Sequence, residues 1–418
     1  MKYTQFAKRL TKMTGIGSLM EDMGAAVQEG SATRMLGGGN PALIPEVNAL
    51  WRRRIEEMLA KGTELEEALT YYDSPQGKRS FIDALAGLLN DEFNWNLGAE
   101  NIAITNGSQT ALFMLFNILA GTGEDGAVRR LLFPMSPEYI GYADQLLDGD
   151  AMCSLPATIE ETRPHFFKYH VDFNSLAIGE EVSALCVSRP TNPTGNVLTD
   201  EEIRKLSRLS ANRDIPLIID NAYGAPFPNI LFKSANAYWD SHIILSMSLS
   251  KLGLPALRTG IIVASREIIS ALSACNAVVS LANVSFGQVL VKPLIDSKEI
   301  LAVSRNLIRP FYQQRLALAL EALQEAFGND FLYFIHEPEG AFFLWLWFPG
   351  LSISSMELYE RLKRRGVVVV SGHYFFYGLD CPWEHTHECL RLSYAPAPEQ
   401  FREAVEIIAD EIRRAGIR

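Results

Sequence analysis

Short apolar runs alternate with helical patterns between about residues 100 and 265. The runs are rich in Ile, Leu and Val, which is typical of buried strands, and they span 102–105, 130–133, 184–188, 217–220, 243–246 and 260–263. Apolar residues at helical spacing predict helices at 108–119, 138–147 and 200–212. Strands that alternate with helices predict a mostly parallel sheet with helices on both faces. Ligands of such sheets bind at the carboxyl ends of the strands.

After about residue 300 the pattern changes to a mixture of strands and helices. Helices are predicted at 302–327 and 356–365, and strands at 332–336, 341–348, 367–370 and 390–393. A last helix follows, because Phe401, Val405, Ile408 and Ile412 share one helical face. This order predicts a smaller α+β domain. We therefore expect an N-terminal arm (1–45), a large domain (46–300) and a small C-terminal domain (301–418).

Composition narrows the possible partners and the compartment. Lys plus Arg number 38 and Asp plus Glu number 49, so the formal net charge is −11, which argues against nucleic acid and anionic membranes. Five cysteines at irregular spacing favour a reduced, cytoplasmic protein. The longest apolar run, 341–348, is far shorter than the roughly 20 residues that a membrane span needs.

Lys251 lies in an otherwise uncharged stretch after a predicted strand. A lysine in apolar surroundings loses proton affinity and becomes a nucleophile toward aldehydes. Three serines precede it at alternate positions, including Ser248, and Arg258 follows seven residues later. Hydroxyls and a guanidinium can hold a phosphate group. A surface lysine beside a serine-rich turn is the alternative interpretation.

Polar residues also follow two other predicted strands. Asp220 ends the apolar run 217–220, and a buried carboxylate there needs a partner, such as a protonated ring nitrogen. Tyr223 is three residues further on and can donate to a ring oxygen. Asn192 lies in a turn with two prolines and a glycine, which is rigid enough to present its amide in one place. Ordinary strand-end turns would explain both patterns equally well.

Two further signals complete the pattern. Gly107 and Ser108 join the first predicted strand to its helix, whose free N–H groups can bind an anion; simple capping by Ser108 is the alternative. Arg391 lies between apolar residues of a predicted strand and needs a carboxylate partner, which an internal salt bridge could also supply.

Together and in this order, these motifs resemble the fold type I pyridoxal-phosphate enzymes, and among them the class I/II aminotransferases. The likeness runs from the glycine turn at 36–41 to Arg391 and beyond. A narrower likeness, to the branch that exchanges amino groups between valine and pyruvate, rests on the stretches 137–142, 188–196, 220–224 and 339–347.

The resemblance implies a role for each matching residue. Lys251 would form the Schiff base with pyridoxal 5′-phosphate, and Asp220 would pair with the pyridine nitrogen. The phosphate would be held by Gly107, Ser108, Gln109, Ser248, Arg258 and, from a neighbouring subunit, Tyr72 or else Tyr71. Tyr139 would stack on the ring, and Asn192 and Tyr223 would bind its phenolic oxygen. The substrate carboxylate would be bound by Asn192, Arg391 and the Gly39 backbone.

The same resemblance implies a homodimer with shared active sites and a ping-pong reaction. Its donors would be small aliphatic amino acids, valine or alanine, and its acceptors pyruvate or 2-oxoisovalerate. A lyase, racemase or decarboxylase of the same fold would use the same lysine, so these activities stay open. A cofactor-binding transcription regulator would need an added DNA-binding domain, for which only about 36 residues precede the glycine turn.

Two other classes are disfavoured. Gly15–Gly17 and Gly37–Gly39 lack the G-x-G-x-x-G spacing of dinucleotide enzymes. No metal is expected, because the spacing of Cys381, His385, His387 and Cys389 does not match a zinc site.

Overall fold

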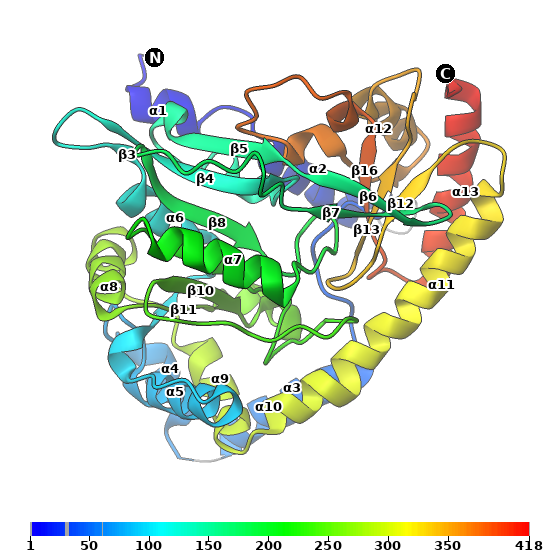
Figure 1. Ribbon diagram of the computed structural model, residues 1–418. Helices are drawn as coiled ribbons and strands as arrows, with labels where there is room; N and C mark the ends of the chain where they lie inside the picture. Colours follow the sequence, from blue (N-terminus) through cyan, green and yellow to red (C-terminus); the bar gives the residue numbers. More distant parts are fainter. Residues whose placement is uncertain (1, 30–32, 61, 418) are drawn as a thin grey trace.

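The computed structural model describes residues 2–29, 33–60 and 62–417, and it is built around two large β-sheets with helices packed on them (Figure 1). The helices are α1 (Gln5–Leu10), α2 (Gly15–Glu29), α3 (Pro45–Ala60), α4 (Glu64–Thr70), α5 (Arg79–Phe93), α6 (Ser108–Leu119), α7 (Asp200–Ala211), α8 (Arg266–Ser280), α9 (Phe286–Asp296), α10 (Glu299–Val303), α11 (Arg309–Phe327), α12 (Ser355–Arg364) and α13 (Pro398–Ala415). The strands are β1 (Arg34–Met35), β2 (Ile102–Thr105), β3 (Gly121–Thr122), β4 (Val128–Ser136), β5 (Met152–Pro156), β6 (Thr158–Arg163), β7 (Phe166–His170), β8 (Val182–Ser188), β9 (Leu217–Asp220), β10 (Ile243–Ser248), β11 (Gly260–Val263), β12 (Phe334–His336), β13 (Phe343–Trp347), β14 (Val367–Val368), β15 (Val370–Ser371) and β16 (Cys389–Ser393).

The larger sheet has the strand order β2-β11-β10-β9-β8-β4-β3, and β5 also pairs with β4. Strands β10, β9, β8, β4 and β5 run parallel to one another. Strand β11 is antiparallel to both of its neighbours, so β2 again runs in the direction of β10. The predicted mostly parallel sheet is confirmed, with β11 and β3 as the reversed strands.

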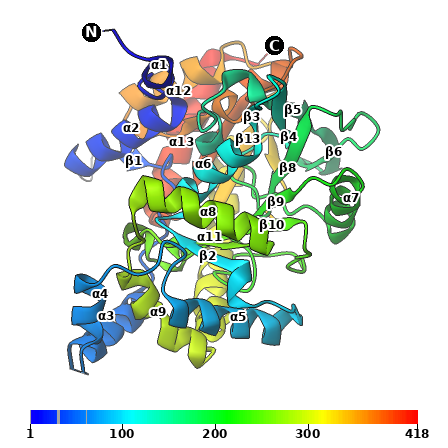
Figure 2. The same cartoon turned by 90° about the vertical axis from the view of Figure 1, so that its left-hand side faces the viewer.

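Helices cover both faces of this sheet, because side chains alternate along its buried strands. Ile218 of β9 belongs to the cluster of α6 and α8 residues, whereas its neighbours Leu217 and Ile219 belong to the cluster that contains Ile203 of α7. Figure 2 shows α6 and α8 lying across one side of the strands. Each such side chain stabilises the fold by about 1.5–3 kcal/mol when it leaves water.

The second sheet has the order β15-β16-β13-β12-β7-β6. Strands β6 and β7 come from the middle of the chain, and β7 pairs in parallel with β12. No strand was expected at 158–170, so this contribution is a finding of the structure. The division into domains 46–300 and 301–418 stays a prediction. In Figure 1, α11 (yellow) and α13 (red) lie beside this sheet and pack against each other.

The N-terminal segment pairs with a short strand of the C-terminal region and forms a separate two-stranded sheet with it. Arg34 and Met35 of β1 pair in parallel with Val367 and Val368 of β14. This pairing carries the chain directly into the glycine turn at 37–39, whose carbonyl groups reach the site described below. The predicted single strand 367–370 is in fact two strands, because β15 pairs with β16 instead.

Two predicted helices were wrong in detail. Residues 138–147 form only a short 3₁₀ turn, Ile140–Tyr142, because Asn117 of α6 bonds the Gln145 carbonyl and the Leu147 N–H, both at 2.8 Å. The helix predicted at 302–327 is interrupted by a wider turn, Ser304–Ile308. Pro310 lies just after it and has no N–H for a helical hydrogen bond. Within the described residues, no helix is long and apolar enough to cross a membrane.

Candidate active site

Most of the predicted site residues meet at the carboxyl ends of the parallel strands. Asp220 ends β9, Asn192 follows β8, and Lys251 follows β10 in the 3₁₀ turn Ser250–Leu252. Because β11 is reversed, β2 also ends here, and Ser108 begins α6 at the same edge. The local sequence thus determines where each strand ends. Because the strands run in the same direction, the side chains that follow them lie at one edge of the sheet.

Lys251 is surrounded by a carbonyl group, aromatic rings and charges. Its Nζ donates to the Gly39 carbonyl at 2.8 Å and lies 5.3 Å from the Tyr223 ring and 5.5 Å from the Phe342 ring. Desolvation, together with the charge of Arg391, lowers the pKa of the amine to about 8, although Asp220 opposes the shift. A large share of this lysine is therefore neutral near pH 8, as a nucleophile requires.

Asp220 is buried, and both of its carboxylate oxygens accept a hydrogen bond. The Tyr142 hydroxyl donates to its Oδ2, and the Ala222 N–H donates to Oδ1 at 3.2 Å. Burial raises the pKa of the Asp220 carboxyl, while the hydrogen bond from Tyr142 lowers it. Side chains on β9 alternate, so Asp220 points to the α6 face together with Ile218.

Glu138 is a second buried carboxyl in this region, and the sequence analysis did not single it out. It accepts hydrogen bonds from the N–H of Ser188 at 2.8 Å and from the hydroxyl of Ser188. Burial raises the pKa of Glu138 to about 8. Ser188 pairs with Asp220 across β8 and β9, so Glu138 supports the strand ends that carry the site.

A positive cradle lies at the α6 N-terminus. Gly107 has φ +92°, and a Cβ there would come within 2.2 Å of the Arg258 guanidinium, so only glycine leaves room for this contact. Ser108 Oγ donates to the Met247 carbonyl at 3.0 Å, and Ser248 Oγ accepts from the Ser250 N–H at 3.1 Å. Gln109 Nε2 donates to the Gly141 carbonyl at 2.9 Å. Helix N–H groups and a guanidinium suit a phosphate group.

Arg391 and Asn192 form the other charged part of the site. Arg391 Nη1 donates to Asn192 Oδ1 at 2.7 Å, and Nη2 donates to the Gly37 carbonyl. Its guanidinium lies 4.4 Å from the Phe343 ring centre. Burial lowers the pKa of Arg391 to about 10, so it remains a cation at neutral pH. Its Nε is buried without a partner among the described residues, and a carboxylate could supply one.

The tyrosines divide into two groups. Tyr223 is buried beside Phe342, with ring centres 5.3 Å apart, and Tyr139 lies 5.1 Å from Tyr142. Tyr71 and Tyr72 are instead 71% and 83% exposed, so a single chain does not bring them into the site.

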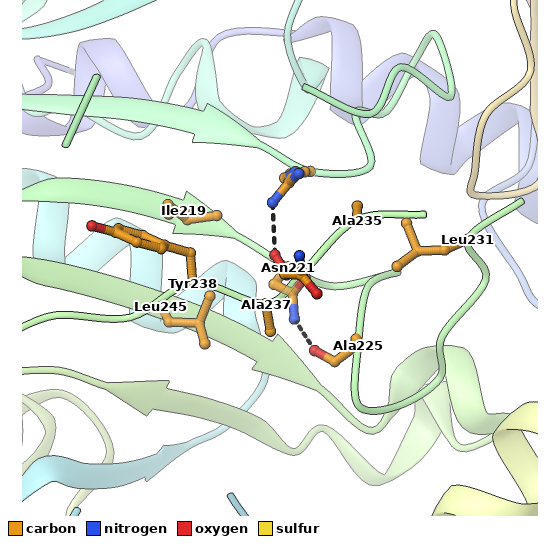
Figure 3. A pocket seen from close by; sticks show the side chains of 10 residues that line it. Ile219, Asn221, Ala225, Leu231, Ala235, Ala237, Tyr238 and Leu245 are labelled. Atoms are coloured by element: carbon orange, nitrogen blue, oxygen red, sulfur yellow. Dashed lines mark hydrogen bonds between the residues drawn. The ribbon is translucent and has the colours of Figure 1, made fainter. Parts of the chain in front are cut away.

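A small cavity on the opposite face of the strand ends is separate from this site (Figure 3). Ile219, Asn221 and Leu245 line it, and Asn221 Nδ2 donates to the Ala225 carbonyl at 2.6 Å. Its volume of about 10 Å³ is no more than one water molecule needs. Successive side chains along the extended chain point to opposite faces, so Asn221 lines this cavity whereas Asp220 belongs to the site.

The histidines and cysteines near the C-terminus do not converge on one point. His385 is buried between Tyr169 and Cys389, and burial lowers the pKa of its ring to about 3. Cys381 is exposed, and His387 stacks 6.4 Å from His373. Within the described residues, no three metal-binding side chains form a group.

Sequence reasoning missed Tyr142, Glu138, Gly37 and Phe342 as parts of the site. Tyr142 and Glu138 fell in the segment expected to be a helix, where nothing in the spacing shows which side chains turn inward. Phe342 lies in an aromatic run that indicated only a core strand. The Gly37 carbonyl carries no side-chain signal at all.

Comparisons with known proteins agree with this geometry. The family model "Aminotransferase class I and II" matches residues 46–408. The valine–pyruvate aminotransferase of Escherichia coli (strain K12) is 48% identical over 415 residues, covering 99% of both chains. Among solved structures, the valine–pyruvate aminotransferase of Salmonella typhimurium LT2 is 47% identical with a TM-score of 0.89, covering 96% of this chain and 99% of that one. A proposed amino-acid aminotransferase from Psychrobacter arcticum 273-4 is 44% identical with a TM-score of 0.96 and covers 99% of each chain.

Proposed function

Because the chain belongs to the class I and II aminotransferases, we propose that it transfers the amino group of valine or alanine to a 2-oxo acid, pyruvate or 2-oxoisovalerate. The substrates follow the Escherichia coli and Salmonella relatives, which are named valine–pyruvate aminotransferases. The observation that carries the reaction is Lys251, whose amine has a pKa of about 8 and lies within the electrostatic reach of Arg391, Asp220 and Arg258.

We propose pyridoxal 5′-phosphate as the cofactor, because the residues fit each of its parts. The α6 N-terminus with Ser108, Ser248 and Arg258 suits the phosphate, with Gly107 and Gln109 shaping the turn. Asp220 is a buried carboxyl at the end of β9 and suits the ring nitrogen. Tyr139 would cover the ring, and Tyr223 with Asn192 would bind its phenolic oxygen. When bound, this cofactor withdraws electrons from the substrate Cα.

Three groups of the chain then perform the work. Arg391 and Asn192 bind the substrate carboxylate, and Arg391 Nε is the donor that has no partner without it. Lys251, held by the Gly39 carbonyl, takes the proton from the substrate Cα as general base. Asp220 keeps a negative charge beside the ring, and Tyr142 supports that charge through its hydroxyl. The overall reaction would be ping-pong.

We also propose a homodimer with shared sites. Leu43, Tyr72, Val278 and Leu281 are all more than 60% exposed, and a subunit interface would remove such apolar surface from water. Tyr72 would reach the phosphate of the neighbouring subunit from this surface. The five cysteines are all free, which supports a cytoplasmic location, and a role in amino-acid biosynthesis follows from the proposed substrates.

The test of the reaction is an absorbance spectrum of the purified protein while amino acids are added one at a time. Valine and alanine should bleach the cofactor band, and valine plus pyruvate should yield alanine. Borohydride reduction followed by mass spectrometry should label Lys251.

A Lys251→Ala protein should lose more than about 100-fold in turnover, whereas Asp220→Ala should retain cofactor and lose most of the rate. Release of ammonia, carbon dioxide or a D-amino acid instead of alanine would indicate a lyase, decarboxylase or racemase.

A further inference from the structure

A buried ion pair joins the second sheet to the turn that presents Asn192. Lys168 of β7 and Glu339, which precedes β13, are each 5% exposed, and Lys168 Nζ is bonded to Glu339 Oε2. Neither residue belongs to the site described above. A charge pair this deep is stable only when further hydrogen bonds satisfy it.

Three further hydrogen bonds of this pair go to one short segment, residues 196–197. Lys168 Nζ donates to Asn196 Oδ1 at 2.7 Å and to the Val197 carbonyl at 3.2 Å. Glu339 Oε2 accepts from the Val197 N–H at 3.0 Å. Lys168 therefore binds oxygen acceptors of this segment, and Glu339 binds one of its N–H donors.

The segment is the far end of the turn that carries Asn192. The Thr191 N–H donates to the Asn196 carbonyl and the Gly195 N–H to the Thr191 carbonyl, both at 2.8 Å. Gly195 has φ +72°, and a Cβ there would lie 2.7 Å from the Gly340 carbonyl, so the turn packs directly on the residue after Glu339. A shift at one end of this closed turn is transmitted to the other.

At the near end, Asn192 Oδ1 accepts from Arg391 Nη1 at 2.7 Å. Arg391 lies on β16 of the second sheet, as Lys168 lies on β7. The turn is thus held against that sheet at two points, one of which is the proposed carboxylate-binding pair.

We propose that Lys168 and Glu339 are positioning residues that hold the Asn192 amide in register with Arg391 and thereby set the affinity for the substrate carboxylate. This inference rests on the proposed function, because it assigns support to the carboxylate pair of that same site. It predicts that loss of Lys168 weakens carboxylate binding more than it slows the proton transfer at Lys251.

The chain offers a matched control. Lys233 also pairs with Glu339, through Oε1 at 2.7 Å, but its side chain is 64% exposed and, within the part of the chain that the structure describes, it does not bond residues 191–197. Lys168→Met and Lys233→Met each remove one cation from the same carboxylate, and only the first removes the bonds to Asn196 and Val197. Lys233 still neutralises Glu339 in Lys168→Met, which favours folding of that variant.

The experiment measures the dissociation constant of isovalerate, which has the carbon skeleton of valine without its amino group, by calorimetry on the cofactor-loaded protein. Lys168→Met should weaken isovalerate binding about tenfold, since a hydrogen bond to a charged group is lost or displaced. The KM for valine should rise by a similar factor, while kcat changes less. Lys233→Met should stay within about twofold of the parent protein on all three measurements.

Glu339→Gln is the second variant, because the amide oxygen can still accept from Val197 while the charge is lost. It should give an intermediate increase in the isovalerate dissociation constant. The proposal is overturned if Lys168→Met lowers only the melting temperature, or if Lys233→Met weakens isovalerate binding equally. Failure of the parent protein to convert valine and pyruvate would overturn the proposed function instead, while the isovalerate comparison would still decide the role of Lys168.

Discussion

At the scale of single residues, the sequence predicted chemical types better than it predicted contacts. Lys251, Asp220 and Arg391 each follow or lie within an apolar run, so their burial and their need for partners could be inferred. The groups that tune them could not, since Tyr142 and Glu138 reach the site only through the irregular path of residues 138–147. Spacing along the chain contains no information about such a path, because it is set by bonds to α6.

The Tyr142 hydroxyl should control the charge on Asp220. Its hydrogen bond lowers the pKa of Asp220, so Tyr142→Phe should raise that pKa and move the acidic limb of the kcat profile to higher pH. The loss of one hydrogen bond to a carboxylate should reduce kcat about tenfold at neutral pH. Steady-state kinetics between about pH 5 and pH 9 measures both effects. Proteins are usually most stable between about pH 5 and pH 8, so the enzyme should stay folded over most of this window.

Tyr377→Phe is the control for this experiment. The Tyr377 hydroxyl donates to the Tyr139 carbonyl at 3.2 Å and has no recorded bond to Asp220. Its removal should leave the acidic limb in place. Equal displacement of the limb in both variants would contradict the assignment of Tyr142.

The low pKa of Lys251 should be visible as chemical reactivity of the cofactor-free protein. A pKa lowered from 10.5 to about 8 means that the amine is mostly protonated below pH 8 and mostly free above it. Carbamylation of Lys251 by cyanate, followed by mass spectrometry, should rise with a midpoint near that pH. Arg391→Met removes a charge that depresses the pKa, so it should move the midpoint upward. A midpoint near the ordinary lysine value of about 10.4 would contradict this account.

At the scale of elements, the ends of a helix could be predicted where nearby side chains cap it. Helix α6 spans the predicted residues, and α7 begins at the predicted Asp200, where Thr199 and Glu202 form a reciprocal capping box. Strand β6 was missed because its residues are mostly exposed and form no apolar run, and the partner that places β7 in the second sheet is distant: β7 meets β12, with Phe166 opposite Ile335. Local pattern cannot report a partner so distant.

The cap at α7 should contribute measurable stability. Glu202 accepts from the Thr199 N–H and hydroxyl, both at 2.8 Å, and lies 3.3 Å from His170. Glu202→Ala should therefore lower the free energy of unfolding by about 1–2 kcal/mol at pH 7. Glu201→Ala, which removes a surface carboxylate with exposed arginine partners, should have a smaller effect. Chemical denaturation of the three proteins measures the difference.

The contribution of Glu202 should also depend on pH with a definite sign. Although burial opposes the shift, the bonds from His170 and Thr199 lower its folded-state pKa from 4.5 to about 2. The ionised form is thus favoured by folding, so the stabilisation is complete above pH 4.5 and is lost as the pH falls toward 2. The gap between parent and Glu202→Ala should narrow below pH 4.5. A constant gap would mean that the carboxylate charge does not matter.

At the scale of the whole molecule, the second sheet sets the geometry of the site as much as the first. It contributes Arg391 from β16 and Lys168 from β7, and the separate β1–β14 pair leads into the turn that carries the Gly37 and Gly39 carbonyl groups. The lysine and the carboxylate-binding arginine therefore come from different sheets. Any relative movement of the two sheets changes the distance between them, and the bonds of both cations to the 37–39 turn resist that movement.

The exposed apolar surface leads to a prediction about assembly. Val278 is 88% exposed and Leu281 is 61% exposed, so burying both in an interface would be favourable. Val278→Asp should place a charge in the proposed dimer interface and shift sedimentation toward the monomer at micromolar concentration. Ala60→Asp is the control, because Ala60 lies at the exposed end of α3. It adds the same charge and should leave the assembly unchanged.

Shared sites make a sharper prediction than dimerisation alone. If Tyr72 serves the neighbouring subunit, a Lys251→Ala chain still donates a normal Tyr72, and a Tyr72→Phe chain still has a normal Lys251. Co-expression should then form hybrid dimers with one complete site, so that the activity of the mixture exceeds the sum of the two separate proteins. Co-expression of the parent chain with a Lys251→Ala/Tyr72→Phe chain is the reverse test. In that hybrid dimer the only remaining Lys251 belongs to the parent subunit, and the neighbouring subunit lacks the Tyr72 hydroxyl, so neither site is complete. Activity that merely adds in the first mixture would contradict the assignment of Tyr72, which is 83% exposed in its own subunit, to the neighbouring site.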